Sequence, residues 1–148
     1  DMEVTWMPSY GPEMRGGTCN CSVVISDESI GSPLVTAPDV LIAMNLPSLD
    51  KFEDSVVPGG TILLDSSLID RKVTRQDVKV CYVDASRLAE ENNMKGSANI
   101  ILVGKMFKEL GFCTEESLYK AVDKCVPPKK AALIEVNKNA LKLGYSVE

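Results

Sequence analysis

The residues best suited to bind a partner lie in one glycine- and proline-rich loop near the start of the chain. Residues 10–17 read Tyr-Gly-Pro-Glu-Met-Arg-Gly-Gly, so that Glu13 and Arg15 stand two positions apart among three glycines. Glycines let a backbone approach a neighbour closely, and Pro12 fixes the direction of the chain. The loop could therefore present backbone N–H groups and the Arg15 guanidinium to an anion or to a protein surface. The alternative is a long surface turn whose two charges are merely solvated.

The chain contains no histidine, and this excludes several kinds of catalytic site. Neither a Ser-His-Asp triad nor a Cys-His pair can be assembled from its residues, and a histidine metal site is impossible. The usual acid or base at neutral pH is also missing. We therefore expect that a cofactor or another subunit carries any chemistry that occurs near this protein, and we predict no catalytic residue in the chain.

The five cysteines do not form a metal-binding pattern. Cys19 and Cys21 are two positions apart, the other three are scattered, and the sequence has no C-x-x-C pair of the kind that holds zinc or iron–sulfur clusters. An odd number without framework spacing is typical of a reducing, cytoplasmic environment with mostly buried thiols. We expect structural cysteines, no metal site and no cofactor held firmly by this chain.

Length and charge narrow the class of protein further. The 148 residues correspond to one domain with a single sizeable core. The net charge of −5, from 16 basic and 21 acidic residues, argues against nucleic acid or an anionic membrane as the main partner. No apolar run approaches the ~18–20 residues that a membrane helix needs. The chain starts at Asp1 and enters a strand-like segment almost directly, so we expect an N-terminal portion to be missing.

Alternating strand and helix patterns predict how these residues are positioned. Residues 18–26 alternate with period two, which predicts a strand with its odd-numbered side chains on one face. The continuous apolar runs at 40–44 and 61–65 are typical of strands covered on both faces of a parallel sheet. Between these two strands, Asn45 is predicted to cap a helix that begins near Pro47.

Later segments predict a further strand and then mainly helices. Residues 78–83 predict a strand, and residues 87–92 the helix that follows it. Residues 100–110 are apolar nearly all round, which predicts a deeply buried helix that ends at Gly111. Together these patterns predict the fold class: a single three-layer α/β domain, residues 1–148, with a mostly parallel sheet.

Two more helices are predicted at the C-terminal end. Thr114 is a suitable cap for a helix with Glu115 and Glu116 in its first turn. The apolar face expected for that helix comprises Leu118, Ala121, Val122 and Cys125. The final helix follows two prolines, and we expect Gly144 to end it. Its expected apolar face comprises Leu133, Val136, Ala140 and Leu143.

Short polar residues follow the predicted strands, where parallel sheets usually bind ligands. These residues are Asn45, Asp65-Ser66-Ser67 and Asp84-Ala85-Ser86. Short polar residues at these positions more often serve as plain helix caps, and that is the favoured interpretation here. No G-x-G-x-x-G fingerprint occurs, and the Lys129-Lys130 pair is more typical of a solvated helix start than of a phosphate site.

The opening loop is also part of a longer family resemblance. Residues 6–18 read WMPSYGPEMRGGT, and with NCSV at 20–23 they closely resemble the γ subunit of 2-oxoacid:ferredoxin oxidoreductases. The resemblance continues in DVLIAMN at 39–45, VPGGT at 57–61 and EVNK at 135–138. Within that family the YGPEMRGG form is most similar to the 2-oxoglutarate type. Family members usually begin with a glycine-rich strand-to-helix loop, which this sequence lacks.

The resemblance implies a fold like domain III of pyruvate-ferredoxin oxidoreductase and a non-catalytic part in a larger enzyme. That enzyme oxidatively decarboxylates a 2-oxoacid to its acyl-CoA, with 2-oxoglutarate expected before pyruvate or a branched-chain acid. Thiamine diphosphate belongs to the α and β subunits and the iron–sulfur clusters to a ferredoxin-like δ subunit. The γ subunit helps to complete the coenzyme A site and the assembly. An isolated γ chain could also pair with a second copy of itself.

The resemblance gives the loop residues specific expected roles. Arg15 would pair with a partner carboxylate or a coenzyme A phosphate, and Glu13 would orient Arg15 or pair across a subunit interface. Tyr10 would stack or donate a hydrogen bond. The predicted cofactor-binding or interface residues are Tyr10, Gly11, Pro12, Glu13, Arg15, Gly16, Gly17 and Asn45. A stand-alone CoA- or nucleotide-binding protein and a pure interaction scaffold remain the alternatives.

Overall fold

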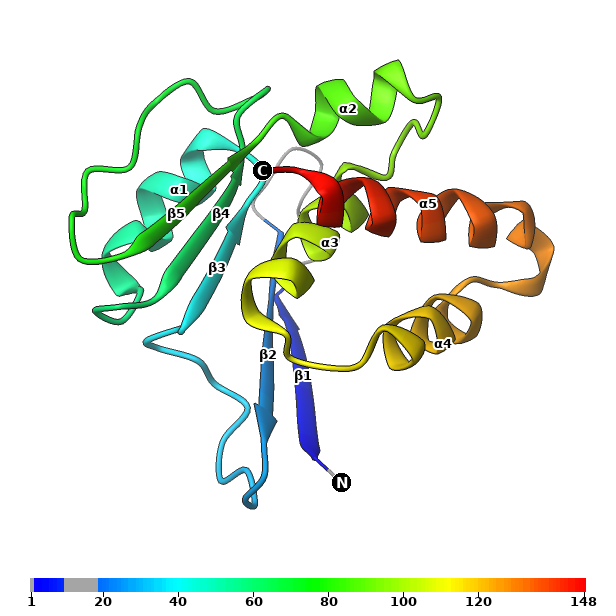
Figure 1. Cartoon of the computed structure of the whole chain (residues 1–148). Helices are drawn as coiled ribbons and strands as arrows, with labels where there is room; N and C mark the ends of the chain where they lie inside the picture. Colours follow the sequence, from blue (N-terminus) through cyan, green and yellow to red (C-terminus); the bar gives the residue numbers. More distant parts are fainter. Residues whose placement is uncertain (1, 10–18) are drawn as a thin grey trace.

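The computed structural model describes residues 2–9 and 19–148, and its strands form two separate sheets (Figure 1). One is a three-stranded parallel sheet, which with its helices makes up residues 40–148, here called the body. The other is a two-stranded antiparallel sheet, here called the hairpin. The part of the chain that the structure describes contains no helix long and apolar enough to cross a bilayer.

The parallel sheet consists of β3 (Val40–Ala43), β4 (Thr61–Asp65) and β5 (Lys79–Val83), in the order β3-β4-β5. Strand β4 lies in the centre and all five of its residues are buried. Because both faces of β4 are covered, its sequence is a continuous apolar run without alternation. The three strands predicted for this sheet are confirmed to within one residue at their ends.

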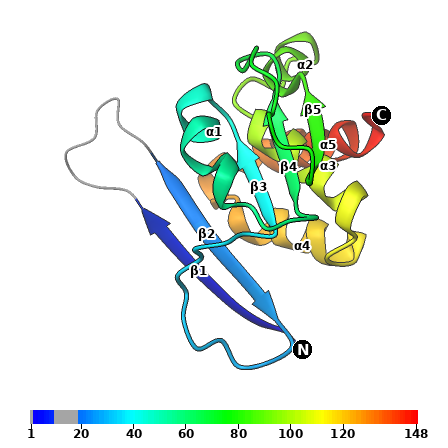
Figure 2. The same ribbon diagram turned by 90° about the vertical axis from the view of Figure 1, so that its left-hand side faces the viewer.

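Helices cover both faces of the parallel sheet, as Figure 2 shows. Helix α1 (Leu46–Phe52) and the 3-10 turn η1 (Glu53–Ser55) lie on one face. Helices α2 (Ala85–Glu91), α3 (Ala98–Leu110) and α5 (Ala132–Ser146) lie on the other. The predicted three-layer α/β arrangement is therefore confirmed for the body.

Each face of the sheet has its own apolar core. Successive β4 residues point to opposite faces, so Ile62 and Leu64 join one core while Leu63 joins the other. The first core contains Ala43, Leu49, Val56, Ile62, Leu64 and Ile69. The second contains Leu63, Cys81, Val83, Ala85, Ala89, Ile101, Leu102 and Ala140. No residue of the hairpin belongs to either core.

Helices α3 and α5 pack backbone against backbone, because each has a glycine where the two helices meet. A Cβ at Gly104 would lie 2.2 Å from the Leu141 carbonyl oxygen, and one at Gly144 would lie 1.9 Å from the Ile101 carbonyl oxygen. The prediction that Gly144 ends the last helix is therefore wrong, since α5 continues to Ser146. Gly111 does end α3, in the left-handed conformation with φ of 57°.

Helix α4 (Glu115–Cys125) begins as predicted, because the Thr114 hydroxyl accepts a hydrogen bond from the Ser117 N–H at 3.2 Å. Its expected apolar face is not a core face, since none of its residues is buried. Leu133 is likewise exposed, and the buried residues of α5 are Ala140, Leu141 and Gly144. The Lys129-Lys130 pair is exposed, in the 3-10 turn η2 (Pro128–Lys130).

The hairpin consists of β1 (Glu3–Ser9) and β2 (Asn20–Ser26), paired antiparallel from Glu3 opposite Ser26 to Ser9 opposite Asn20. The strand predicted over 18–26 is confirmed for residues 20–26. Figure 2 shows the hairpin extending along one side of the molecule, beside the parallel sheet and outside it.

The prediction of mostly buried thiols is wrong. All five cysteines are free, but only Cys81 is buried, and Cys113 is half-buried. Cys19, Cys21 and Cys125 are exposed. The reason is that neither the odd-numbered face of β2 nor any side of α4 belongs to a core.

Candidate functional site

The loop predicted to meet a partner lies outside the described residues. It contains the predicted site residues Tyr10, Gly11, Pro12, Glu13, Arg15, Gly16 and Gly17. The structure does describe the base of this loop, where Ser9 at the end of β1 pairs with Asn20 at the start of β2. The roles assigned to the loop residues therefore stay predictions.

Asn45, the remaining predicted site residue, follows β3 and caps helix α1. Its side-chain oxygen accepts a hydrogen bond from the Ser48 N–H at 2.9 Å, with Pro47 in the first turn of the helix. The cap was one of the two roles considered for this residue. The cap leaves Asn45 exposed at the carboxyl end of the sheet.

The polar residues that follow β4 and β5 come together, as their positions in the sequence predict. They border an open cavity of about 510 Å³ at the carboxyl end of the sheet. We call this cavity the strand-end crevice. Its lining residues are Ser66, Ser67, Leu68, Asp84, Ser86, Arg87 and Glu90.

Asp65 has a structural role beside this crevice. Its carboxylate is fully buried and accepts hydrogen bonds from the Ser86 hydroxyl at 2.6 Å, the Ser86 N–H at 3.1 Å and the Ser67 N–H at 3.1 Å. These bonds tie the end of β4 to the start of α2. Since three donors already satisfy this carboxylate, Asp65 stabilises the crevice wall and is not available to a ligand.

The charged groups of the crevice are largely paired with one another. Asp84 accepts hydrogen bonds from the Ser66 hydroxyl and from the Arg87 guanidinium. Arg87 also lies near Glu91, at 4.0 Å. With carboxylates outnumbering the single guanidinium, the described part of the crevice suits hydroxyl or amide groups better than a phosphate.

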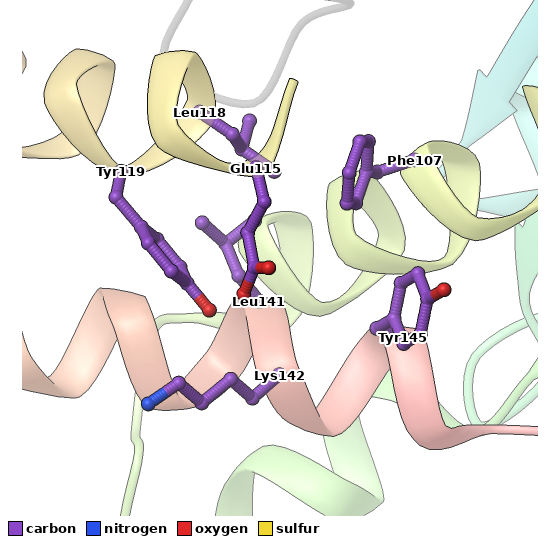
Figure 3. Close-up of a pocket in the computed structure, with 7 residues that line it drawn as sticks. All are labelled: Phe107, Glu115, Leu118, Tyr119, Leu141, Lys142 and Tyr145. Atoms are coloured by element: carbon purple, nitrogen blue, oxygen red, sulfur yellow. The ribbon is translucent and has the colours of Figure 1, made fainter. Parts of the chain in front are cut away.

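A second cavity, of about 250 Å³, lies between helices α3, α4 and α5 (Figure 3). Phe107 and Tyr145 form an aromatic wall, with ring centroids 5.7 Å apart. At the polar end, a hydrogen bond to Glu115 raises the pKa of Tyr119, and the Lys142 ammonium lies 5.8 Å from the Tyr119 ring. The cavity can hold a small apolar group beside the hydrogen-bonded pair of Tyr119 and Glu115. Sequence reasoning assigned Leu118 to a core and missed this cavity, because three helices contribute its lining.

Residues 2–9 and 19–148 contain no cluster of side chains of the kind that binds a metal ion. Within those ranges no three Cys, Asp or Glu side chains are grouped as metal ligands would be. The features of the described residues that could bind a partner or ligand are the strand-end crevice, the cavity between α3, α4 and α5, and the base of the loop.

Comparison with known proteins identifies the family. The family model described as pyruvate ferredoxin/flavodoxin oxidoreductase matches residues 1–147. The chain is 42% identical over 142 residues to the ketoisovalerate oxidoreductase subunit VorA of Methanothermobacter thermautotrophicus, covering 95% of this chain and 29% of that relative. It is thus less than a third as long as the VorA subunit it matches.

Two further comparisons cover most of both proteins. The 2-oxoglutarate synthase subunit KorC of Methanocaldococcus jannaschii is 35% identical over 98% of this chain and 77% of its own length. The solved structure of the keto/oxoacid ferredoxin oxidoreductase γ subunit from Geobacter sulfurreducens is 29% identical, with a TM-score of 0.78 over 97% of this chain and 79% of that one. On sequence and fold together, the chain belongs to the pyruvate ferredoxin/flavodoxin oxidoreductase family.

Proposed function

We propose that this chain is the γ component of a multisubunit 2-oxoacid:ferredoxin oxidoreductase. Such an enzyme converts a 2-oxoacid and coenzyme A to an acyl-CoA and carbon dioxide, and passes two electrons to ferredoxin. The observation that carries the proposal is the match to KorC, which extends over 98% of this chain and 77% of that subunit. The likeness to a solved γ subunit supports the same assignment.

The chain contributes assembly and coenzyme A contacts rather than the reaction itself. It has no histidine, and its described residues contain no group of metal ligands. We assign thiamine diphosphate to the α and β subunits and the iron–sulfur clusters to a ferredoxin-like δ subunit. Five free cysteines are compatible with a reducing compartment, so we propose a cytoplasmic location.

For the substrate, we propose 2-oxoglutarate, on the basis of the YGPEMRGG loop at residues 10–17. A branched-chain 2-oxoacid is the second candidate, because the chain is 42% identical to a ketoisovalerate oxidoreductase subunit. The side chain of the acid distinguishes the two, since 2-oxoglutarate carries a second carboxylate and ketoisovalerate a branched apolar group. Purification of the complex from its native cells, followed by assays with 2-oxoglutarate, ketoisovalerate and pyruvate, tests both. Recovery of this chain without any 2-oxoacid-oxidising activity would refute the proposed function.

Within the chain, we propose that Arg15 of the loop binds a coenzyme A phosphate or a partner carboxylate. Arg15→Ala in the reconstituted complex should raise the KM for coenzyme A about tenfold or weaken assembly to a similar degree, as expected for loss of one charge-assisted hydrogen bond. Unchanged assembly together with an unchanged KM would contradict this role.

Arg87→Ala is the matched control, because it removes an exposed guanidinium from the strand-end crevice. If the loop binds coenzyme A, Arg87→Ala leaves the KM for coenzyme A within about twofold. If the crevice binds it instead, the effects of the two substitutions are reversed. Titration calorimetry of the complex with coenzyme A gives the same comparison without turnover.

A further inference from the structure

The hairpin has one face made almost entirely of apolar side chains. In an antiparallel pair, residues directly opposite each other point to the same face. The register pairs Val4 with Ile25, Trp6 with Val23 and Pro8 with Cys21, and all six of these residues are exposed. We call these six residues the hairpin apolar face. None of them carries a charge.

The large side chains of this face are open to solvent to an unusual degree. The exposed fraction is 66% for Trp6, 59% for Val4, 51% for Val23 and 45% for Ile25. Neither apolar core of the body includes a hairpin residue, so no described part of the body covers this face. Single exposed apolar residues are ordinary, but a contiguous set around a tryptophan is typical of an interaction surface.

The stability of the hairpin leads to the same conclusion. An isolated two-stranded hairpin is at best marginally stable in water. Strands β1 and β2 are long and well paired, and this pairing is the principal contact that either strand makes with another described helix or strand. Burial of Trp6 and its neighbours in an interface would supply the missing stabilisation, since each aromatic side chain can bury ~150–250 Å².

We propose that the hairpin apolar face docks against an uncharged, apolar surface of another subunit of the same oxidoreductase. This inference rests on the proposed function, and it names the surface by which the chain would join the other subunits. The choice of partner is supported by relative length, because in VorA the matching region is 29% of a longer polypeptide and so is joined to further domains. The base of the predicted partner-binding loop lies at one end of the same hairpin, which favours one continuous interface.

Cys21 provides a natural reporter, because its thiol belongs to the hairpin apolar face and is exposed. Cys125, exposed on α4, is the internal reference. Labelling with iodoacetamide, followed by mass spectrometry, compares the isolated chain with the purified complex. We expect Cys21 to react at least tenfold more slowly in the complex, with the rate at Cys125 changed less than twofold. Equal Cys21 rates in both samples would overturn the proposal.

The same labelling distinguishes other occupants of this face. Protection of Cys21 that grows with the concentration of the isolated chain would assign the face to a second copy, and would overturn the proposed partner. Protection in the isolated chain at every concentration would mean that the chain itself covers the face. That result would also overturn the proposed partner.

A charge-introducing variant tests the energetics of docking. Trp6→Lys should weaken association with the partner subunits at least tenfold, measured by pull-down titration. Leu34→Lys is the matched control, because Leu34 is a similarly exposed apolar residue outside the hairpin, and it should change association less than twofold. Circular dichroism of both variants checks that the body remains folded.

The outcomes separate this inference from the proposed function. If the chain never associates with subunits that oxidise 2-oxoacids, the proposed function fails. If it associates with them and Trp6→Lys binds as well as Leu34→Lys, only the hairpin interface fails.

Discussion

The central strand of the body and the strands of the hairpin use similar residues in opposite environments. Strand β4 and strand β2 are both rich in β-branched and apolar side chains, yet β4 is fully buried and Val23 and Ile25 of β2 are about half exposed. The difference lies in what covers each sheet, since α1 and α3 pack on opposite faces of the parallel sheet and no described element covers the hairpin apolar face. An apolar strand therefore predicts burial, but it does not say whether its own domain or a partner provides it.

The two regions also differ in how they are held together. In the body, buried polar groups reinforce the cores. The Glu53 carboxylate binds the Arg71 guanidinium at 2.7 Å and the Thr74 N–H at 2.6 Å, which fixes the long segment between β4 and β5. The hairpin relies on its ladder of backbone pairs. The body should thus be sensitive to changes inside one chain, and the hairpin to the loss of a partner.

The largest expected effect comes from the glycine crossing in the body. Gly144→Ala puts a methyl group 1.9 Å from the Ile101 carbonyl oxygen, and helices α3 and α5 must separate to admit it. We expect a loss of about 3 kcal/mol in the free energy of unfolding, measured by urea denaturation. Gly31→Ala is the control, because a Cβ there meets no atom within 4 Å, and it should change stability by less than about 0.5 kcal/mol. Equal effects of the two substitutions would contradict the close crossing.

A smaller effect is expected from an ion cluster that joins β5 to α3. Hydrogen bonds from Lys105 and Lys79 lower the pKa of Glu109 to about 2. A carboxyl with a depressed folded-state pKa stabilises the protein above its unfolded pKa of about 4.5, and this contribution is lost as the pH falls toward 2. We expect a loss of about 1 kcal/mol from this group after solvent screening. Glu109→Gln should flatten the decline of stability between pH 4.5 and pH 2, followed by thermal denaturation, and an unchanged slope would argue against the cluster.

The smallest expected effect is at the hairpin. Trp6→Ala in the isolated chain removes a side chain that contributes to neither core, so its free energy of unfolding should change by less than about 0.5 kcal/mol. Truncating a buried core residue of similar apolar character normally costs several times more. A large destabilisation by Trp6→Ala would mean that the hairpin is packed within the chain, and the contrast between the two regions would disappear.

Most of the body could be predicted from the sequence because its signals are local. The buried runs predicted β3 and β4, the caps Asn45 and Thr114 predicted helix starts, and Gly111 predicted a helix end. Helix α2 begins two residues earlier than expected, at Ala85. This difference is within the usual uncertainty of helix ends.

The candidate site could be predicted only in part. The strand pattern predicted that the residues after β4 and β5 lie at the same edge of the sheet. It did not predict that the Asp65 carboxylate already accepts hydrogen bonds from Ser67 and Ser86. It also gave no sign of the cavity beside Phe107 and Tyr145. Such features depend on side chains that meet across many residues of chain, for which a single sequence has no periodic signal.

By itself, the sequence determined the α/β class, the positions of the strands and helix caps, the lack of histidine chemistry and the family. Those properties follow from composition, from residue types a few positions apart in the sequence, or from short sequence motifs. Only the tertiary structure decided that Gly144 lies inside a helix crossing and that Trp6 and Val23 face outward. The physical reason is that burial and close approach are properties of two surfaces, and one of those surfaces is always supplied by a distant segment or another molecule.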